Sequence, residues 1–267
     1  MPTTPEGLRM LLGAGTDTIT DDYTLEQKFA EFRRLNLDFV EVPLRSTDAT
    51  AQAETFRTLA AAHGLPIASA VIAEFVRLPD MPEAERADAV RRIADTALTA
   101  VDLGCDLVLI PVRVKPEEPE RAESYAEGYA ELLTATKQHG TVIAAEFVGG
   151  ARPADAANLV RVVDDPRARL FFDVGNCLYA GADPVSDLRT LLPLVAQVHL
   201  KGGPDTPLAA MPLRELHEVV RSGGFQGRCA LEIESPKGRQ SLRDAVSVLR
   251  MYGLWTPAHE GNTTHAG

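Results

Sequence analysis

The sequence has few cysteines and no apolar run long enough to cross a membrane. Its 267 residues include three cysteines, Cys105, Cys177 and Cys229. An odd number of cysteines without C-x-x-C spacing argues against a disulfide framework. No uncharged apolar stretch approaches the roughly 18 residues of a membrane span, and the N-terminus lacks the basic start and apolar run of a signal peptide. We therefore expect a cytoplasmic protein with reduced thiols.

Signals for nucleotide and nucleic-acid binding are missing as well. The first apolar run leads into residues 13–18, which contain only two glycines and no GxGxxG motif, and GxxxxGK[ST] occurs nowhere. Their absence argues against a dinucleotide-binding doubly wound sheet and against a P-loop. A formal net charge of −11 repels nucleic-acid phosphates. We expect no nucleic-acid partner.

Strand-like and helix-like segments alternate along the whole chain. In the segment 24–35, apolar residues recur at helical spacing behind Thr24, and the longer segments 83–103 and 119–139 are rich in Ala, Glu and Arg. Several of these segments stop at a glycine just before the next apolar run, at Gly64, Gly104 and Gly140. The apolar or β-branched runs lie near 8–14, 37–43, 66–73, 105–112, 141–147, 169–173, 195–200 and 228–234.

Eight strand-helix units favour an α/β fold of the closed (β/α)8 type, the TIM barrel, over an open sheet. With 45% apolar and 24% charged residues, the composition is that of a globular protein. No break in composition divides the chain. We therefore predict a single barrel domain over residues 1–255, eight helices, and a flexible polar tail over 256–267.

Four polar residues end four of the apolar runs in the C-terminal half. They lie about 26 to 33 positions apart, the length of one strand-helix unit: Glu146, Asp173, His199 and Glu232. The carboxyl ends of barrel strands meet at one rim, so these side chains are expected to converge. Three carboxylates and one imidazole suit a divalent metal ion. This pattern points to an enzyme.

The motifs around these residues resemble those of the xylose isomerase-like barrels. The similar segments are 37–42, 145–147, 172–184, 198–201 and 224–234. That superfamily includes sugar phosphate isomerases and epimerases, tagatose epimerase, hydroxypyruvate isomerase, inosose dehydratase and dehydroshikimate dehydratase. The resemblance implies one divalent ion (Mn²⁺, Mg²⁺, Co²⁺ or Zn²⁺) held by Glu146, Asp173, His199 and Glu232. It also implies that the two glutamates are the acid–base catalysts.

Each residue also has a simpler interpretation. A single His after a strand is more often a hydrogen-bonded core residue, and a carboxylate there is often half of a salt bridge. Glu232 and Glu234 lie two apart on the same side of their strand. The spacing from the preceding Gly-Phe-Gln-Gly favours Glu232 as the ligand and leaves Glu234 nearer the rim.

Further residues at the strand ends are candidates for substrate binding: Glu74, Arg113, Asn176, Lys201 and Glu234. The alternative for Lys201 is a structural ion pair with a nearby acid, and for Arg113 a solvated network at the rim. Asn176 stands where several epimerase-like relatives have a histidine, and no arginine follows His199 closely. These departures weaken assignment to any one characterised epimerase.

The resemblance leads us to expect a metal-dependent isomerase or epimerase in carbohydrate metabolism. It would act on a small sugar or hydroxy-keto compound by glutamate-mediated proton transfer through a metal-stabilised enediolate. The same site in a dehydratase or lyase is the main alternative. A non-catalytic binding barrel is disfavoured by the complete ligand set. A hydrolase of the endonuclease IV type would need more imidazoles at early strand ends, whereas His63 and His139 precede their strands. We expect no membrane partner, and a homodimer or homotetramer is a further possibility.

Overall fold

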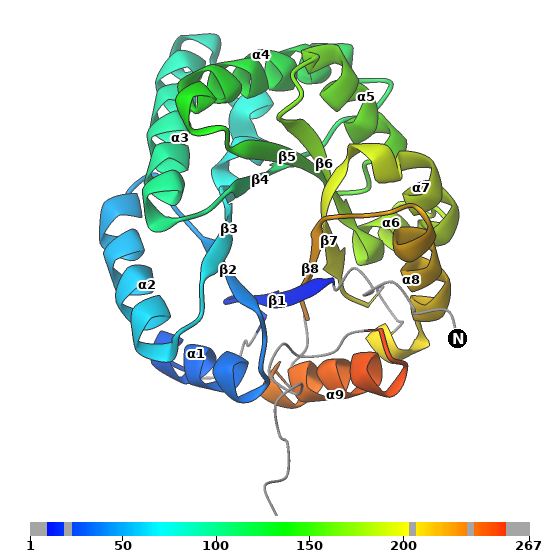
Figure 1. Ribbon diagram of the computed structural model, residues 1–267. Coiled ribbons are helices and arrows are strands. Elements are labelled where there is room, and N and C mark those ends of the chain that lie inside the picture. The colour runs from blue at the N-terminus through cyan, green and yellow to red at the C-terminus, as the bar shows by residue number, and fades with distance from the viewer. Residues whose placement is uncertain (1–9, 19–22, 203–206, 234–237, 255–267) are drawn as a thin grey trace, which may run out of the picture.

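Eight apolar runs form eight parallel strands that close into a barrel (Figure 1). The computed structural model describes residues 10–18, 23–202, 207–233 and 238–254. Each strand pairs with the next in the chain, and β1 pairs with β8, which closes the ring. The strands are β1 (Leu11–Gly15), β2 (Phe39–Pro43), β3 (Ile67–Val71), β4 (Leu107–Val112), β5 (Val142–Phe147), β6 (Ala168–Asp173), β7 (Val195–Leu200) and β8 (Arg228–Leu231). The predicted (β/α)8 fold is confirmed.

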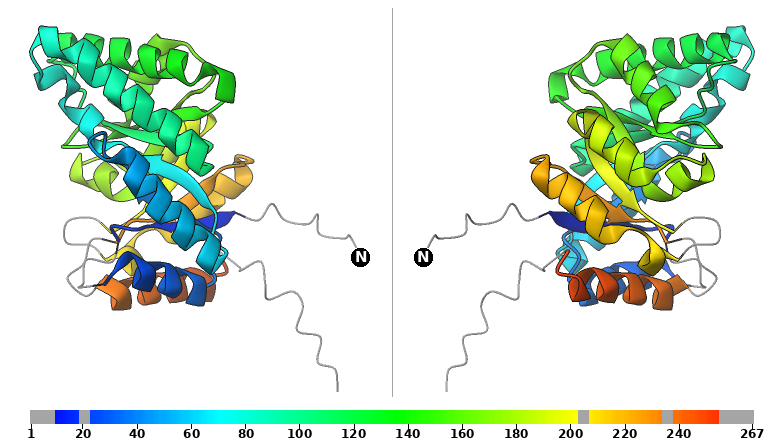
Figure 2. Two further views of the ribbon diagram at one scale, coloured as in Figure 1. Left: turned by 90° about the vertical axis from the view of Figure 1, so that its left-hand side faces the viewer. Right: turned by 90° about the vertical axis from the view of Figure 1, so that its right-hand side faces the viewer.

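Helices surround the barrel and run along the outside of the strands (Figures 1 and 2). The α-helices are α1 (Leu25–Arg34), α2 (Ala49–His63), α3 (Glu83–Leu103), α4 (Pro119–Ala135), α5 (Pro153–Val163), α6 (Val174–Tyr179), α7 (Pro184–Leu191), α8 (Leu213–Ser222) and α9 (Gly238–Met251). Short 3-10 helices are η1 (Ala73–Asp80), η2 (Lys137–His139), η3 (Leu192–Leu194) and η4 (Leu208–Ala210). Nine α-helices therefore occur among the described residues instead of the predicted eight, because two helices, α6 and α7, follow β6.

Local signals set several helix ends. Thr24 and Gln27 form a capping box at the start of α1, in which each side chain accepts from the other residue's backbone N–H. Gly64 and Gly104 end α2 and α3 in the left-handed conformation, with φ of 61° and 102°. α4 ends at Ala135, earlier than the predicted 139, and a 3-10 turn replaces its last residues. The Thr136 hydroxyl there donates to a carbonyl of the preceding turn.

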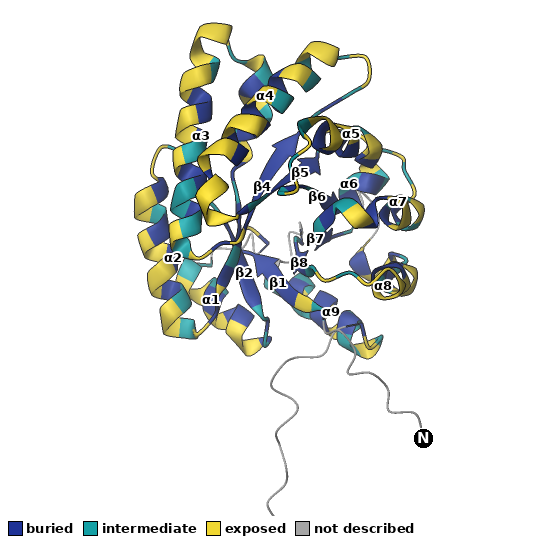
Figure 3. Cartoon of the chain, turned by 45° about the horizontal axis from the view of Figure 1, so that its top comes forward, coloured by how far each residue is buried: buried dark blue, intermediate teal, exposed yellow. Residues whose placement is uncertain are grey.

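Both faces of the strands are buried. Val108 and Ile110 of β4 pack in the large cluster between strands and helices, whereas Leu107 and Leu109 join a small cluster inside the barrel. Alternation of side chains along a strand produces these two layers. Figure 3 shows the buried strands at the centre and the exposed outer faces of the surrounding helices.

Two sequence predictions concern residues at or beyond the limits of the described part of the chain. β8 ends at Leu231, before the predicted residue 234, but the backbone N–H of Glu232 still donates to the Leu200 carbonyl of β7 at 3.3 Å. Glu234 and the predicted tail 256–267 lie outside the described residues. Within the described part of the chain, no helix has the length and apolar character needed to cross a bilayer.

Candidate metal and catalytic centre

The four residues predicted to converge lie together at the carboxyl ends of β5, β6, β7 and β8. One ligand atom from each lies within 4.8 Å of the others. The His199 Nδ1 atom is 3.3 Å from a Glu146 oxygen, 3.3 Å from a Glu232 oxygen and 3.6 Å from an Asp173 oxygen. We call this group the four-residue cluster. Three carboxylates and one imidazole with their ligand atoms this close together form a donor set that fits a divalent ion.

The strand register explains the convergence. Asp173 of β6 lies opposite His199 of β7, and His199 lies opposite Ala230 of β8. Glu232 follows Ala230 by two residues and so points to the same side, the barrel interior. Glu146 lies near the end of β5, beside Phe171 of β6. Polar residues that end their strands thus meet across the open end of the barrel.

The two oxygens of Asp173 have different surroundings. Its Oδ1 atom accepts from the Asn176 backbone N–H at 2.6 Å, which caps the first turn of α6. Its Oδ2 atom is buried and has no hydrogen-bond partner, although the Lys201 ammonium lies 3.0 Å away. A buried carboxylate oxygen aimed at other ligands is suited to a cation. The residues present therefore fit a bound metal ion.

Lys201 lies beside the cluster and is almost fully buried. Its Nζ atom is 2.9 Å from a Glu232 oxygen and 3.0 Å from Asp173 Oδ2. The lysine stem passes over Gly175, where an added Cβ would lie 2.5 Å from the Lys201 Cγ atom. Of the two interpretations left open by the sequence, the structure shows the ion pair with nearby acids. Substrate binding by Lys201 stays a prediction.

The two glutamates of the cluster have different environments. Burial is the main cause that raises the pKa of Glu146, to about 8. Burial also acts on Glu232, but the charges of His199 and Lys201 outweigh it and hold the pKa of Glu232 below its ordinary range. Burial alone would lower the pKa of His199, yet nearby carboxylates, first Glu41 and then Glu232, raise it well above its ordinary value. In the metal-free site, Glu146 is therefore the weaker acid of the two.

The sequence interpretation missed a hydrogen bond that holds His199. Glu41 of β2 is buried, and its Oε1 atom is 2.6 Å from His199 Nε2. In the sequence, Glu41 lies within the segment 37–42, where only the resemblance of the second strand distinguishes it. The signal that could have revealed it is a carboxylate in the middle of an apolar strand, where burial requires a partner.

The remaining predicted residues divide into two groups. The Asn176 side-chain amide donates to the cluster, 3.4 Å from a Glu146 oxygen. Both oxygens of Glu74 accept from the Ser46 backbone N–H at 3.0 and 3.1 Å, so Glu74 holds the loop after β2. Arg113 is half-exposed and lies 3.5 Å from Asp80. Within the described residues, no hydrogen bond or ion pair joins Glu74 or Arg113 to the cluster, and their roles stay predictions.

Among the described residues, the extra histidines that a multi-metal hydrolase needs do not lie at this rim. His63 ends α2 and contacts Glu26 at 2.8 Å, His139 lies in η2, and His217 lies in α8. Among the described residues, the cluster contains His199 as its one imidazole.

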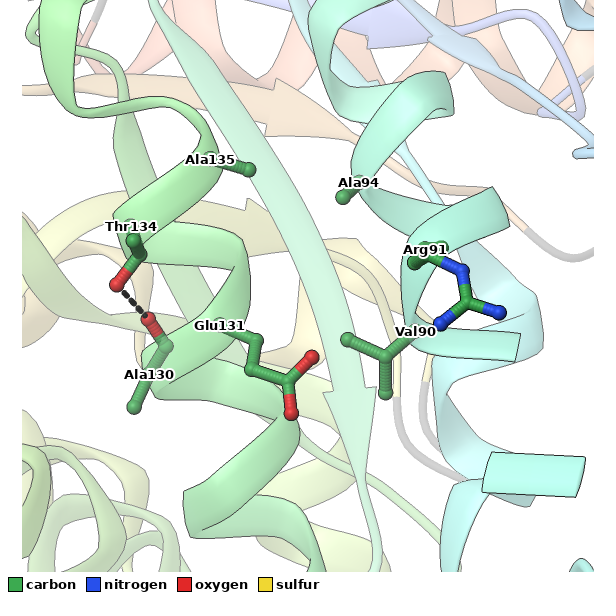
Figure 4. A pocket seen from close by; sticks show the side chains of 7 residues that line it. All are labelled: Val90, Arg91, Ala94, Ala130, Glu131, Thr134 and Ala135. Carbon is green, nitrogen blue, oxygen red and sulfur yellow. Dashed lines mark hydrogen bonds between the residues drawn. The ribbon is translucent and has the colours of Figure 1, made fainter. Parts of the chain in front are cut away.

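A hollow of about 380 Å³ lies outside the barrel, between α3 and α4 (Figure 4). Its walls carry one arginine and one glutamate, and the Thr134 hydroxyl donates to the Ala130 carbonyl of its own helix. The other lining residues are Val90, Ala94 and Ala135. Of these side chains only Arg91 and Glu131 are charged, and they lie on different helices, so this hollow offers no ligand set comparable to the four-residue cluster.

A family model described as a xylose isomerase-like TIM barrel matches residues 29–252. No curated protein shows a significant match to the sequence. The match covers most of the chain, from α1 to the residue after α9.

Several solved structures share the fold. A 3-keto-D-glucoside 4-epimerase from E. coli is 17% identical and has a TM-score of 0.76, with 91% of this chain and 100% of that chain covered. A D-psicose 3-epimerase is 14% identical, with a TM-score of 0.72 and coverage of 91% and 98%. A candidate 3-DHS dehydratase from Bacillus anthracis is 15% identical, with a TM-score of 0.69 and coverage of 90% and 99%. At these identities the similarity establishes the fold.

Proposed function

Because the chain belongs to the xylose isomerase-like TIM barrel family, we propose that it is a divalent-metal-dependent isomerase or epimerase. Its substrate would be a small sugar or a hydroxy-keto compound. The observation that supports this most strongly is the convergence of Glu146, Asp173, His199 and Glu232, with ligand atoms within 4.8 Å of one another. The epimerases among the structures of the same fold support it further.

The four-residue cluster would hold the ion. Three carboxylates and one imidazole suit Mn²⁺, Mg²⁺, Co²⁺ or Zn²⁺. A bound divalent ion would polarise a carbonyl and its neighbouring hydroxyl, which acidifies the C–H bond between them. Backbone pairing between neighbouring strands fixes the positions of Glu146, Asp173 and His199, and such placement favours catalysis by orientation.

The two glutamates would move the proton. Glu146 and Glu232 extend from β5 and from the end of β8, so they approach the centre of the site from different strands. One carboxylate removes the proton next to the carbonyl and leaves an enediolate. The other glutamate, in its protonated carboxylic acid form, returns a proton to the opposite face, which is epimerisation, or to the adjacent carbon, which is aldose–ketose isomerisation. Asn176 and Lys201 would bind substrate oxygens beside them.

A dehydratase is the second candidate. Loss of a β-hydroxyl from the same enediolate would give a dehydrated product. Two observations support a dehydratase as the second candidate function. Asn176 replaces the histidine of epimerase-like relatives, and the Bacillus anthracis structure described as a candidate 3-DHS dehydratase has the same fold. The Lys201 ammonium, next to the cluster, could protonate a departing hydroxyl.

Deuterium exchange tests the proposal without knowledge of the product. The protein with added Mn²⁺ is incubated in deuterated water with ketoses, ketose phosphates, inososes and hydroxy-keto acids, and NMR follows incorporation next to the carbonyl. We expect metal-dependent exchange with at least one class, and loss of that exchange in Glu146→Gln. Exchange that continues at full rate in Glu146→Gln would contradict the assigned role. An exposed glutamate in α4, changed in Glu131→Gln, provides the matched control.

A further inference from the structure

A buried polar layer lies in the barrel interior next to the four-residue cluster. It consists of Glu41 on β2, Ser69 on β3 and Gln197 on β7, which are 2%, 0% and 0% exposed. The chemistry proposed above uses none of these three residues. Burying a carboxylate in a barrel interior is costly unless specific partners compensate for it. The layer therefore calls for an explanation.

The two oxygens of Glu41 have separate partners. Its Oε2 atom accepts from the Ser69 hydroxyl at 2.7 Å and from the Gln197 side-chain amide at 2.9 Å. Its Oε1 atom is 2.6 Å from His199 Nε2. Two donors thus fix the orientation of the carboxylate, and the remaining oxygen faces the histidine.

A second contact holds the same imidazole. The Phe171 ring lies edge-on to the His199 ring, with 4.3 Å between the ring centroids and 64° between the planes. With Nε2 held by Glu41, the Nδ1 atom faces the carboxylates of the cluster at 3.3 to 3.6 Å. The ring is therefore restrained by a hydrogen bond at one nitrogen and by an aromatic neighbour.

We propose, on the basis of the proposed function, that Glu41 is a positioning residue for the metal site. Its carboxylate keeps the ring proton of His199 on Nε2 and presents the Nδ1 lone pair to the ion. Ser69 and Gln197 contribute indirectly, because their hydrogen bonds fix the orientation of the Glu41 carboxylate. Partners of this kind orient a ligating histidine and set its tautomer.

The hydrogen bonds predict a specific effect of Glu41→Gln. In this variant the side-chain oxygen is the better partner for the two donors, Ser69 and Gln197. The new amide group then points at His199 Nε2, which has to accept instead of donate. The ring proton moves to Nδ1, and the imidazole is lost as a ligand although the shape of the side chain is preserved.

Zinc binding and the histidine tautomer test the proposal. Zn²⁺ serves as a diamagnetic probe, with its affinity measured by competition with a chelator and the ring nitrogens of His199 followed by ¹⁵N NMR. In the wild-type protein we expect a protonated Nε2 and a ligated Nδ1. In Glu41→Gln we expect the affinity to fall by about 10- to 100-fold, as for other partners of metal-bound histidines.

The matched control is another buried glutamate far from the cluster. Glu31 of α1 is 6% exposed and pairs with Arg34 and Arg243. Glu31→Gln should keep the zinc affinity and the tautomer of His199. An equal loss of affinity in Glu31→Gln would mean that general destabilisation is responsible and would overturn the inference.

The outcomes separate the two proposals. A wild-type protein that binds no Zn²⁺ contradicts the proposed function itself. A wild-type protein that binds it, with unchanged affinity and tautomer in Glu41→Gln, refutes the role of Glu41 alone. Should Glu41→Gln fail to fold, the wild-type spectrum still decides, because zinc on Nε2 of His199 would exclude the proposal.

Discussion

The raised pKa of Glu146 makes the metal-free protein sensitive to alkaline pH. Burial raises that pKa from 4.5 to about 8, so the folded state binds a proton that the unfolded state releases. The stability associated with this proton is fully present below pH 4.5 and is lost as the pH rises through about 8. His199, whose pKa is also raised, acts in the same direction above pH 6.5.

The size of the change in the free energy of unfolding follows from the shift in the pKa of Glu146. Each pH unit between the two pKa values corresponds to about 1.4 kcal/mol, which gives an upper limit of about 5 kcal/mol for Glu146. Because Glu146 titrates together with His199 and the other carboxylates, we expect about 2–3 kcal/mol. The variant Glu146→Gln places a neutral group of the same shape at this position and removes the dependence.

Thermal unfolding in the presence of a chelator measures the difference in stability between the wild type and Glu146→Gln. At pH 8.5 we expect metal-free Glu146→Gln to be more stable than the wild type, with a Tm roughly 5–10 °C higher. At pH 5 the two should be nearly equal. The exposed control Glu131→Gln should follow the wild type at both pH values. If Glu146→Gln is as stable as the wild type at pH 8.5, or less stable, the account of this buried carboxyl is wrong.

Three further substitutions test other parts of the structure. Lys201→Met should bind divalent ions about 5- to 10-fold more tightly, because the Lys201 ammonium competes for the ligand oxygens that it contacts at 2.9 and 3.0 Å. Weaker binding of the variant in a chelator competition would show that the lysine instead orders the site. Glu31→Gln should lower the free energy of unfolding by about 1–2 kcal/mol, because it breaks the ion pair between Glu31 and Arg243 that joins α1 to α9. An unchanged denaturation midpoint would argue against a stabilising role for this ion pair. Gly175→Ala should destabilise the protein by about 2 kcal/mol, because its Cβ would lie 2.5 Å from a backbone oxygen and from the lysine stem; a thermal melt that matches the wild type would refute the predicted clash.

The fold and the convergence of the four cluster residues could be predicted from the sequence because both depend on local pattern. An apolar run that ends in Asp173 or His199 contains the strand and the polar side chain in one segment. A closed barrel then brings such ends to one rim, whatever the details of packing. Gly64 and Gly104 marked helix ends for a similarly local reason, since a left-handed residue favours glycine.

The residues that contact the cluster could not be predicted, because their contacts depend on how strands on opposite sides of the barrel are aligned. Glu41 and His199 are 158 positions apart and meet only when β2 and β7 face each other through the interior. Lys201 follows His199 by two residues and shares its side of the strand, but its contact with Glu232 depends on the chain beyond β8. Glu74 occupies a strand-end position of the expected kind, yet a backbone N–H takes both of its oxygens.

The central claim is that four distant residues bind one shared cation. Anomalous X-ray diffraction from crystals grown with Mn²⁺ locates such an ion directly. We predict one manganese peak per chain, within coordination distance of Glu146, Asp173, His199 and Glu232. Crystals with no anomalous peak among these side chains, at a Mn²⁺ concentration that occupies other carboxylate sites, would contradict the claim.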